Sequence, residues 1–458
     1  MIEGELKLEQ VKSRKRVKDF GEVYTQPREV NAMLDLVKEE SYRTDSLFLE
    51  PACGNGNFLV EILKRKLTVA QNKEEVATSL SSIYAIDILE DNIMESKKRL
   101  YELVKDTLTQ EEAFFIMNQN IVYGDSLELL NHSPYIEMKF DVIIGNPPYQ
   151  LNDGGGTGSS AMPLYHKFIN QAKSLNPKYI TMIIPSRWFA GGRGLDDFRY
   201  TMLTDRRIRH LTDYPNSKEC FPSNNIEGGV CYFLWEQDYR GDCEVKTING
   251  DKISVTTRPL LEDGLDVFIR DNHAISILKK VNTSEDRVSK IVSESKPFGL
   301  RSYFKGSEEK TKENSIAVFG NKAVTYINST SVLKNHDLLK KHKVFIGKAY
   351  GNGNSTPYKV INNPIIGEKD TVCTETYLSV GGWDSCAEAQ NFISYCNTKF
   401  FRFLLSLKKI SQNMTKSTYE FIPIQDFSKP WTDAELYEKY GLTQKEIDYI
   451  ETMIRPMN

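Results

Sequence analysis

The sequence predicts an α/β fold: a Rossmann-like, doubly wound sheet, followed by a second domain of mixed α+β structure. Between residues 46 and 235, short apolar runs of strand length alternate with longer segments of helical periodicity. The runs are SLFLE, IYAID, FDVIIG, YITMIIP and GGVCYFLW. Because these runs are apolar on both faces, we expect a largely parallel sheet that helices cover on each side. A chain of 458 residues has room for two or three domains.

Two segments between the runs predict the covering helices. Phe58–Ala70 and Leu164–Leu175 both place apolar side chains at helical intervals. After Trp235, the segment EQDYRGDCEVKTI has the pattern of a hairpin that closes the sheet. The sequence therefore predicts one large α/β domain.

Beyond about residue 251 the composition changes: Ser, Thr, Asn and Lys become more frequent, and the alternation of predicted strands and helices does not continue. We therefore expect one domain at 1–250, which begins with the basic arm VKSRKRVK, and a second domain at 251–458. The second domain should end in helices at Ala387–Ser406 and Asp433–Met453.

The composition excludes several classes of protein. The chain is 40% hydrophobic and 26% charged, which is ordinary for a globular protein, and its net charge of −3 excludes a protein that coats nucleic acid by bulk positive charge. No apolar run is long enough to span a membrane, and the first residues have no signal-peptide core. The seven cysteines form no C-x-x-C pair, so we expect a reduced, cytoplasmic protein with no metal.

The strongest chemical signal is DVIIGNPPY, at Asp141–Tyr149. An apolar strand ends in a turn that holds Asn146, Pro147, Pro148 and Tyr149, at the sheet edge where α/β folds place their chemistry. The prolines stiffen the turn, Asn146 offers a side-chain carbonyl, and Tyr149 offers a planar face. Such a corner suits a planar exocyclic amine, whose lone pair becomes available when two acceptors bind its N–H groups. A plain turn at the end of a strand is the structural alternative.

The second signal is FLEPACGNGNF, at Phe48–Phe58. A strand ends in Glu50, and the following loop carries Gly54 and Gly56 before a helix. A dinucleotide fingerprint would need glycine at position 59, which is Leu59, and no phosphate-binding Gly-Lys-Ser/Thr loop is present. An acidic loop without an anion site favours a cationic ligand without pyrophosphate, such as S-adenosylmethionine.

Two further acids end predicted strands. Asp87, in IYAID, is placed to accept hydrogen bonds from ribose hydroxyls, and Asp125, in IVYGDS, is placed to accept one from the amino group of an adenine. Each acid alone would be an ordinary turn former. In chain order with the glycine loop and N-P-P-Y, they predict an S-adenosylmethionine site.

These motifs, together with FGEVYTQP near the start, resemble the gamma-class adenine-N6 DNA methyltransferases of the TaqI type. The resemblance covers most of residues 17–250. It implies that Thr25 holds the methionine carboxylate and that the methionine part is lined by Glu50, Ala52, Gly54 and Gly56. Asp87 would then bind the ribose and Asp125 the cofactor adenine. The catalytic positions would be Asn146, Pro147, Pro148 and Tyr149, with Tyr149 stacked on the target base.

The tail, from SKPFGLRSYF onward, resembles more loosely the target-recognition domains of restriction-associated members, and identifies no base-reading residue. The resemblance implies double-stranded DNA as the partner, a target adenine rotated out of the duplex, and a companion restriction endonuclease. The glycines between 154 and 158 would form a flexible segment over that base. Two other functions stay open: an N-methyltransferase for RNA or protein glutamine, and a DNA-binding specificity subunit.

Overall fold

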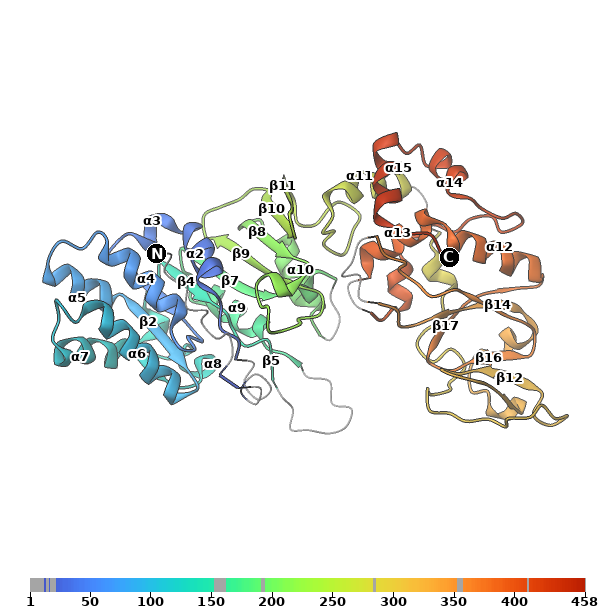
Figure 1. Cartoon of the computed structure of the whole chain (residues 1–458), viewed down its shortest axis with the longest axis horizontal. Coiled ribbons are helices and arrows are strands. Elements are labelled where there is room, and N and C mark those ends of the chain that lie inside the picture. The colour runs from blue at the N-terminus through green and yellow to red at the C-terminus, as the bar shows by residue number, and fades with distance from the viewer. Residues whose placement is uncertain are drawn as a thin grey trace, which may run out of the picture. The chain divides into compact units, whose positions relative to one another are not determined.

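The computed structural model describes residues 12–13, 16, 22–151, 162–190, 194–282, 286–351, 357–409 and 412–457. The chain divides into two units, Met1–Phe268 and Ile269–Asn458, which are drawn in Figure 1 and described here one at a time. Most of the basic arm, Phe20 and Gly21 of the first motif, and the glycines between 154 and 158 lie outside the described residues.

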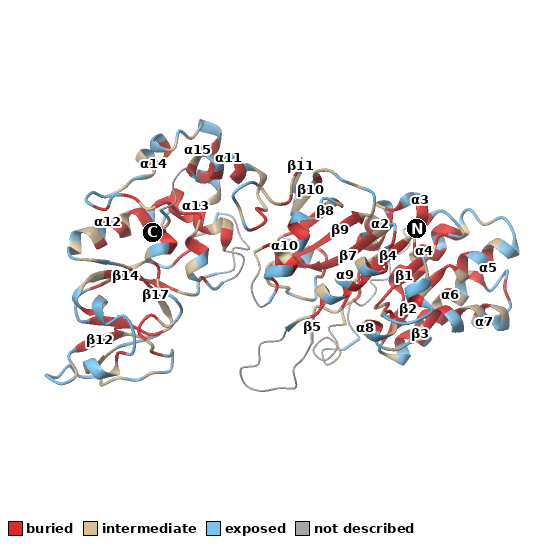
Figure 2. Ribbon diagram, turned by 180° about the vertical axis from the view of Figure 1, so that it is seen from behind, coloured by how far each residue is buried: buried red, intermediate tan, exposed pale blue. Residues whose placement is uncertain are grey.

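A mixed, mostly parallel sheet forms the centre of unit 1. Within the described residues it has nine strands in the order β11-β10-β8-β9-β7-β4-β1-β2-β3. The strands are β1 Phe48–Glu50, β2 Ile83–Asp87, β3 Ile121–Tyr123, β4 Val142–Gly145, β7 Tyr179–Pro185, β8 Ile208–Tyr214, β9 Val230–Glu236, β10 Cys243–Asn249 and β11 Lys252–Arg258. The chain runs outward from β1 in both directions, so the sheet is doubly wound, as the sequence predicts. Figure 2 shows its strands buried between the helices.

Helices cover both faces of this sheet. The helices of the unit are α2 Pro27–Asp35, α3 Lys38–Ser41, α4 Asn57–Leu67, α5 Lys73–Ser81, α6 Glu90–Val104, α7 Gln110–Asn120, α8 Ser126–Leu129, α9 Tyr165–Ser174 and α10 Asp196–Thr204. Side chains of α2 and α4–α7 form one core with the sheet, while α9 and α10 form the other. Alternate residues of β9 enter the two cores, since Tyr232 belongs to the first and Phe233 to the second. A short hairpin, β5 Gln150–Leu151 with β6 Met162–Pro163, follows β4.

The end of this domain differs from the prediction in two details. The segment after Trp235 supplies only one strand of a hairpin, because β10 pairs with β8 and with β11, while β9 lies between β7 and β8. The hairpin is β10–β11. The boundary at 250/251 therefore cuts this hairpin at its turn, and unit 1 continues to Phe268.

Unit 2 has mixed α+β structure. In its described residues, two three-stranded sheets have the orders β13-β12-β16 and β15-β14-β17. The strands are β12 Ile316–Phe319, β13 Val324–Ile327, β14 His342–Gly347, β15 Ile365–Gly367, β16 Thr371–Cys373 and β17 Tyr377–Trp383. The helices are α11 Asn272–Val281, α12 Cys386–Asn397, α13 Lys399–Lys408, α14 Asp433–Lys439 and α15 Gln444–Met453.

Each long helix predicted in this unit is two helices. Thr398 ends α12 with an extended backbone, and its side chain accepts a hydrogen bond from Phe401 N at the start of α13. Gly441, with φ of +58°, lies between α14 and α15. All seven cysteines lie in the described residues, and none of them forms a disulfide there. Within the described residues, every helix falls short of the length and apolar character needed to cross a bilayer.

Candidate active site

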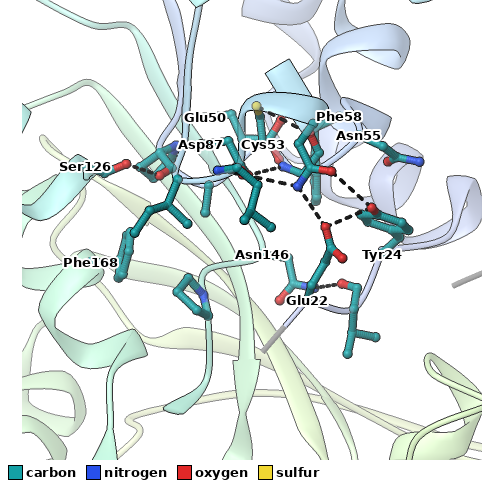
Figure 3. A pocket seen from close by; sticks show the side chains of 18 of the residues that line it. Glu22, Tyr24, Glu50, Cys53, Asn55, Phe58, Asp87, Ser126, Asn146 and Phe168 are labelled. Carbon is teal, nitrogen blue, oxygen red and sulfur yellow. Dashed lines mark hydrogen bonds between the residues drawn. The ribbon is translucent and has the colours of Figure 1, made fainter. Parts of the chain in front are cut away.

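A cavity opens where β1, β2, β3 and β4 end (Figure 3). It encloses about 1090 Å³ of empty space, including its mouth. Eight of the eleven predicted site residues line it: Thr25, Glu50, Ala52, Gly54, Asp87, Asp125, Asn146 and Pro148. The other three, Gly56, Pro147 and Tyr149, lie outside its lining. One cavity thus joins the glycine loop to the N-P-P-Y turn, two motifs that are far apart in the sequence.

Glu50 places a buried, unpaired carboxylate against this cavity. Its side chain is only 2% exposed, and Oε2 has no hydrogen-bond partner among the described residues. Burial, together with the nearby Asp87 carboxylate, raises the pKa of Glu50 well above its usual value. A buried carboxylate without a partner is costly, so the position favours a cationic ligand.

The glycine loop after β1 needs both of its glycines. Gly54 has φ of +53°, and a Cβ there would lie 3.0 Å from Cε1 of Tyr24. Gly56 has φ of +84° where it caps α4, and a Cβ there would lie 2.8 Å from Oγ of Ser96. Larger residues fit neither the backbone conformation nor the space. Gly56 therefore shapes the loop without lining the cavity.

Asp87, the last residue of β2, and Asp125, which follows β3, line the cavity and also accept hydrogen bonds from the backbone around it. Asp87 accepts hydrogen bonds from Gly54 N (2.8 Å), Leu89 N (2.9 Å) and Nδ2 of Asn92 (3.2 Å). Its carboxylate therefore fixes the glycine loop to the start of α6. Asp125 caps α8 by accepting from Leu127 N at 2.9 Å, and it is otherwise exposed.

The segment before α2 forms another wall. Thr25 is 3% exposed, and its hydroxyl has no hydrogen-bond partner among the described residues, whereas its backbone carbonyl accepts from Nδ2 of Asn57 at 2.8 Å. Sequence reasoning missed three neighbours that line the cavity. Glu22 accepts from the Tyr24 hydroxyl at 2.9 Å and from Nδ2 of Asn92 at 2.8 Å. Glu22 and Tyr24 belong to the motif FGEVYTQP, but Asn92 had no signal in the sequence.

The N-P-P-Y turn presents one side chain to the cavity with a fixed orientation. Nδ2 of Asn146 donates to Val23 O at 2.9 Å, and Oδ1 accepts no hydrogen bond from the described residues. Pro148 also lines the cavity, while Pro147 is buried and is not part of the lining. Tyr149 is half-buried, with a buried hydroxyl that has no partner in the described residues, and burial raises the pKa of this hydroxyl well above its usual value.

Apolar side chains complete the lining on the side of β2 and β3. Ile88, directly after Asp87, lines the cavity and is 51% exposed. Leu127 of α8 and Phe168 of α9 line it as well. Figure 3 shows the Phe168 ring near Ser126. Sequence reasoning counted Phe168 only as part of a helical face. Apolar side chains beside strand-end acids suit a planar base with polar edges.

The fold and the cavity define an α/β methyltransferase domain. Residues 56–221 match the family described as Eco57I restriction-modification methylase. Over these residues the chain is therefore similar to the Eco57I restriction-modification methylases. The finer TaqI-type roles of single residues stay predictions.

Three curated relatives are each similar to part of the chain. An "uncharacterized adenine-specific methylase" of Mycoplasma pneumoniae is 31% identical over 191 residues, 41% of this chain and 42% of that protein. A tRNA (guanine(6)-N2)-methyltransferase of Methanocaldococcus jannaschii is 26% identical, covering 33% and 43% of the two chains. The type II methyltransferase M.VspI of a Vibrio species is 28% identical, covering 36% and 38%. The chain thus spans less than half the length of each of these relatives.

The fold extends to both units in one solved structure. The type IIL restriction-modification enzyme MmeI, solved in complex with DNA, aligns with 89% of this chain and 69% of its own, with a TM-score of 0.54 and 10% identity. At this identity the likeness concerns the fold alone.

Proposed function

We propose that this protein is a site-specific DNA methyltransferase, which transfers a methyl group from S-adenosylmethionine to N6 of adenine in duplex DNA. The observation that carries the proposal is the single cavity that contains both the unpaired Glu50 carboxylate and the free Oδ1 of Asn146. A cation site and an amine-accepting site in one cavity are what a methyl transfer between two ligands requires.

The described residues fit S-adenosylmethionine. Glu50 offers a carboxylate to its cationic methionine part, and the free Thr25 hydroxyl offers a donor to its carboxylate. Asp87 and Asp125 offer acceptors to the ribose and the adenine amino group, and Ile88 offers an apolar face to the adenine ring. When bound, the cofactor supplies an electrophilic methyl group on a sulfonium.

Asn146 would act on the target amine. Because Val23 O takes its amide nitrogen, Oδ1 remains to accept from an exocyclic N–H, and the Pro147 carbonyl would accept from the other. Acceptors placed before the reaction stabilise positive charge as it develops on the nitrogen. Because the target amine lies inside the base-paired duplex, the base would have to leave the duplex to reach Asn146, with Tyr149 as its stacking partner.

Unit 2 offers a surface suited to DNA. Tyr303 and Leu333 are 79% and 67% exposed, and Arg301, Lys305 and Lys334 beside them in the chain are exposed as well. The two loops meet, because Leu333 N donates to Phe298 O at 3.1 Å. We call these five residues the Tyr303 surface: Arg301, Tyr303, Lys305, Leu333 and Lys334. Exposed basic and aromatic side chains together are typical of nucleic-acid contacts, and residues 269–458 would then form the target-recognition domain.

A second candidate function is N-methylation of RNA, which the similarity to the M. jannaschii tRNA enzyme favours. An exocyclic amine of guanine would meet the same Asn146 acceptor. A specificity subunit without catalysis is less consistent with an intact cavity. The Eco57I match favours a role in a restriction-modification system, with a companion endonuclease as a further proposal.

The function is tested by incubating the purified protein with labelled S-adenosylmethionine and, in parallel, duplex DNA, tRNA and total protein. Nucleoside mass spectrometry then identifies the product. We expect label in N6-methyldeoxyadenosine. Label in N2-methylguanosine of tRNA would replace the proposal with the second candidate, and label in glutamine would exclude both.

A further inference from the structure

Three side chains of types that commonly serve as metal ligands meet in unit 2. They are His342, the first residue of β14, Glu368, directly after β15, and Cys386, the first residue of α12. Each residue offers one ligand atom, and these three atoms lie within 4.8 Å of one another. They are an imidazole nitrogen of His342, a carboxylate oxygen of Glu368 and Sγ of Cys386. We propose that these three residues bind a zinc ion. The proposal does not depend on the function proposed above.

The distances between the donor atoms suit a shared ion. Nδ1 of His342 lies 3.1 Å from Oε2 of Glu368, yet this nitrogen is buried and makes no hydrogen bond among the described residues. The Cys386 thiol donates to the other carboxylate oxygen, Oε1, at 3.7 Å. Donors at about 2.1 Å (nitrogen or oxygen) and about 2.3 Å (sulfur) from a tetrahedral zinc ion lie roughly 3.4–3.6 Å apart. Small side-chain shifts would therefore complete the site.

The backbone already holds the ligands in place. The carbonyl oxygen of Glu368 accepts from Nζ of Lys343 at 3.0 Å and from Oγ1 of Thr371 at 2.6 Å. His342 pairs with Trp383 in the β14–β17 ladder, and α12 packs against β14 (Figure 1). A site whose ligands are positioned before binding loses little entropy when the ion arrives.

The donor set selects the ion. Imidazole and thiolate favour zinc over magnesium or calcium, which take oxygen ligands. The Cys386 thiol would lose its proton to solvent when the ion binds, and the fourth position would hold water. The ion would connect three elements through its ligands: the start of β14 through His342, the turn after β15 through Glu368 and the start of α12 through Cys386. These three ligands are far apart in the chain and form no short motif, which is why the sequence alone predicts no metal.

The test uses the reactivity of Cys386, since the other six cysteines are buried. Protein freed of metal with EDTA is alkylated with iodoacetamide, with and without zinc, and the modified peptides are mapped by mass spectrometry. We expect zinc to slow the alkylation of Cys386 at least about tenfold in wild-type protein. In His342→Ala and Glu368→Ala the protection should be far smaller. Loss of an outer-shell partner already lowers metal affinity about 10–100-fold, and loss of a direct ligand should lower it at least as much. His336→Ala, an exposed histidine of the same unit, is the matched control and should behave as wild type.

Cobalt(II) gives an independent readout. Wild-type protein should show the thiolate-to-cobalt charge-transfer absorption and Cys386→Ser should lack it. Zinc should raise the melting temperature of wild type but not of Cys386→Ser. Circular dichroism without metal checks that each variant is folded. If zinc left Cys386 equally reactive, or protected it equally in His342→Ala, the proposal would be overturned.

Discussion

The side-chain amide of Asn146 donates to the backbone carbonyl of Val23, 123 residues earlier in the chain, at 2.9 Å. This bond decides which end of the amide faces the cavity. Because the nitrogen is taken by Val23, the oxygen remains for a substrate amine. The segment before α2 therefore sets the chemistry of the N-P-P-Y turn as well as a wall of the cavity.

We predict that Asn146→Ala removes methyl transfer and leaves cofactor binding nearly unchanged. Loss of one preorganised hydrogen-bonding group in the transition state typically costs about 10²–10³-fold in rate. Single-turnover methylation measures the rate, and calorimetry measures the affinity for S-adenosylmethionine. Asn131→Ala is the matched control, since its amide also donates to a backbone carbonyl but lies outside the cavity lining. Near-normal turnover in Asn146→Ala would refute the assigned role.

Cofactor affinity should depend on pH through Glu50. Its pKa is raised in the free protein by burial and by Asp87, and a cationic ligand lowers it by favouring the carboxylate. Binding of the cofactor therefore releases a proton from Glu50. The affinity for S-adenosylmethionine should rise with pH, starting at about 4.3, the ordinary pKa of Glu, and should become constant once Glu50 is ionised in the free protein. The pKa of Glu50 is also higher in the folded free protein than in the unfolded chain. The free energy of unfolding of the free protein should therefore fall as pH rises through this range.

Calorimetry in buffers of different ionisation enthalpy measures this proton release. Glu50→Gln should weaken binding and remove the release, because the amide cannot titrate. Unchanged proton release in Glu50→Gln would assign the pH dependence to another group.

The sequence predicted several individual strands well and the order of the strands in the sheet poorly. β2 and β7 have the predicted bounds, because strands buried on both faces give continuous apolar runs. The place of β9 between β7 and β8 had no local signal, since strand order depends on long-range pairing. Likewise, the motifs predicted eight cavity residues, whereas Asn92 and Phe168 reach the cavity only through the way α6 and α9 pack.

Stability should depend on the buried Lys66 of α4. Its side chain is 0% exposed, and Nζ donates to the carbonyls of Arg43, Thr44 and Ser46 at 2.9, 3.3 and 2.6 Å. Lys66→Met leaves these carbonyls without their donor, which should cost about 3 kcal/mol of unfolding free energy. Denaturant unfolding measures the loss. Lys64→Met in the same helix, where the side chain is 52% exposed, should change stability by less than about 0.5 kcal/mol.

The Tyr303 surface should carry the salt dependence of DNA binding. Lys305→Ala with Lys334→Ala should weaken binding to a random duplex and lower the slope of log K against log salt by about 1 to 2, since each phosphate contact contributes about 0.9. Fluorescence anisotropy at several salt concentrations measures the slope. Lys369→Ala with Lys445→Ala removes two exposed charges elsewhere in unit 2 and is the control. Equal slopes for both double variants would exclude this surface.

The most direct test is long-read sequencing of DNA from cells that make this protein, with modified bases called in their sequence context. We predict N6-methyladenine at one short sequence in cells with the wild-type chain and none at that sequence in cells with Asn146→Ala. Unmodified adenine in both, with the protein present and folded, would contradict the central claim that this cavity brings a methyl donor to an adenine amine.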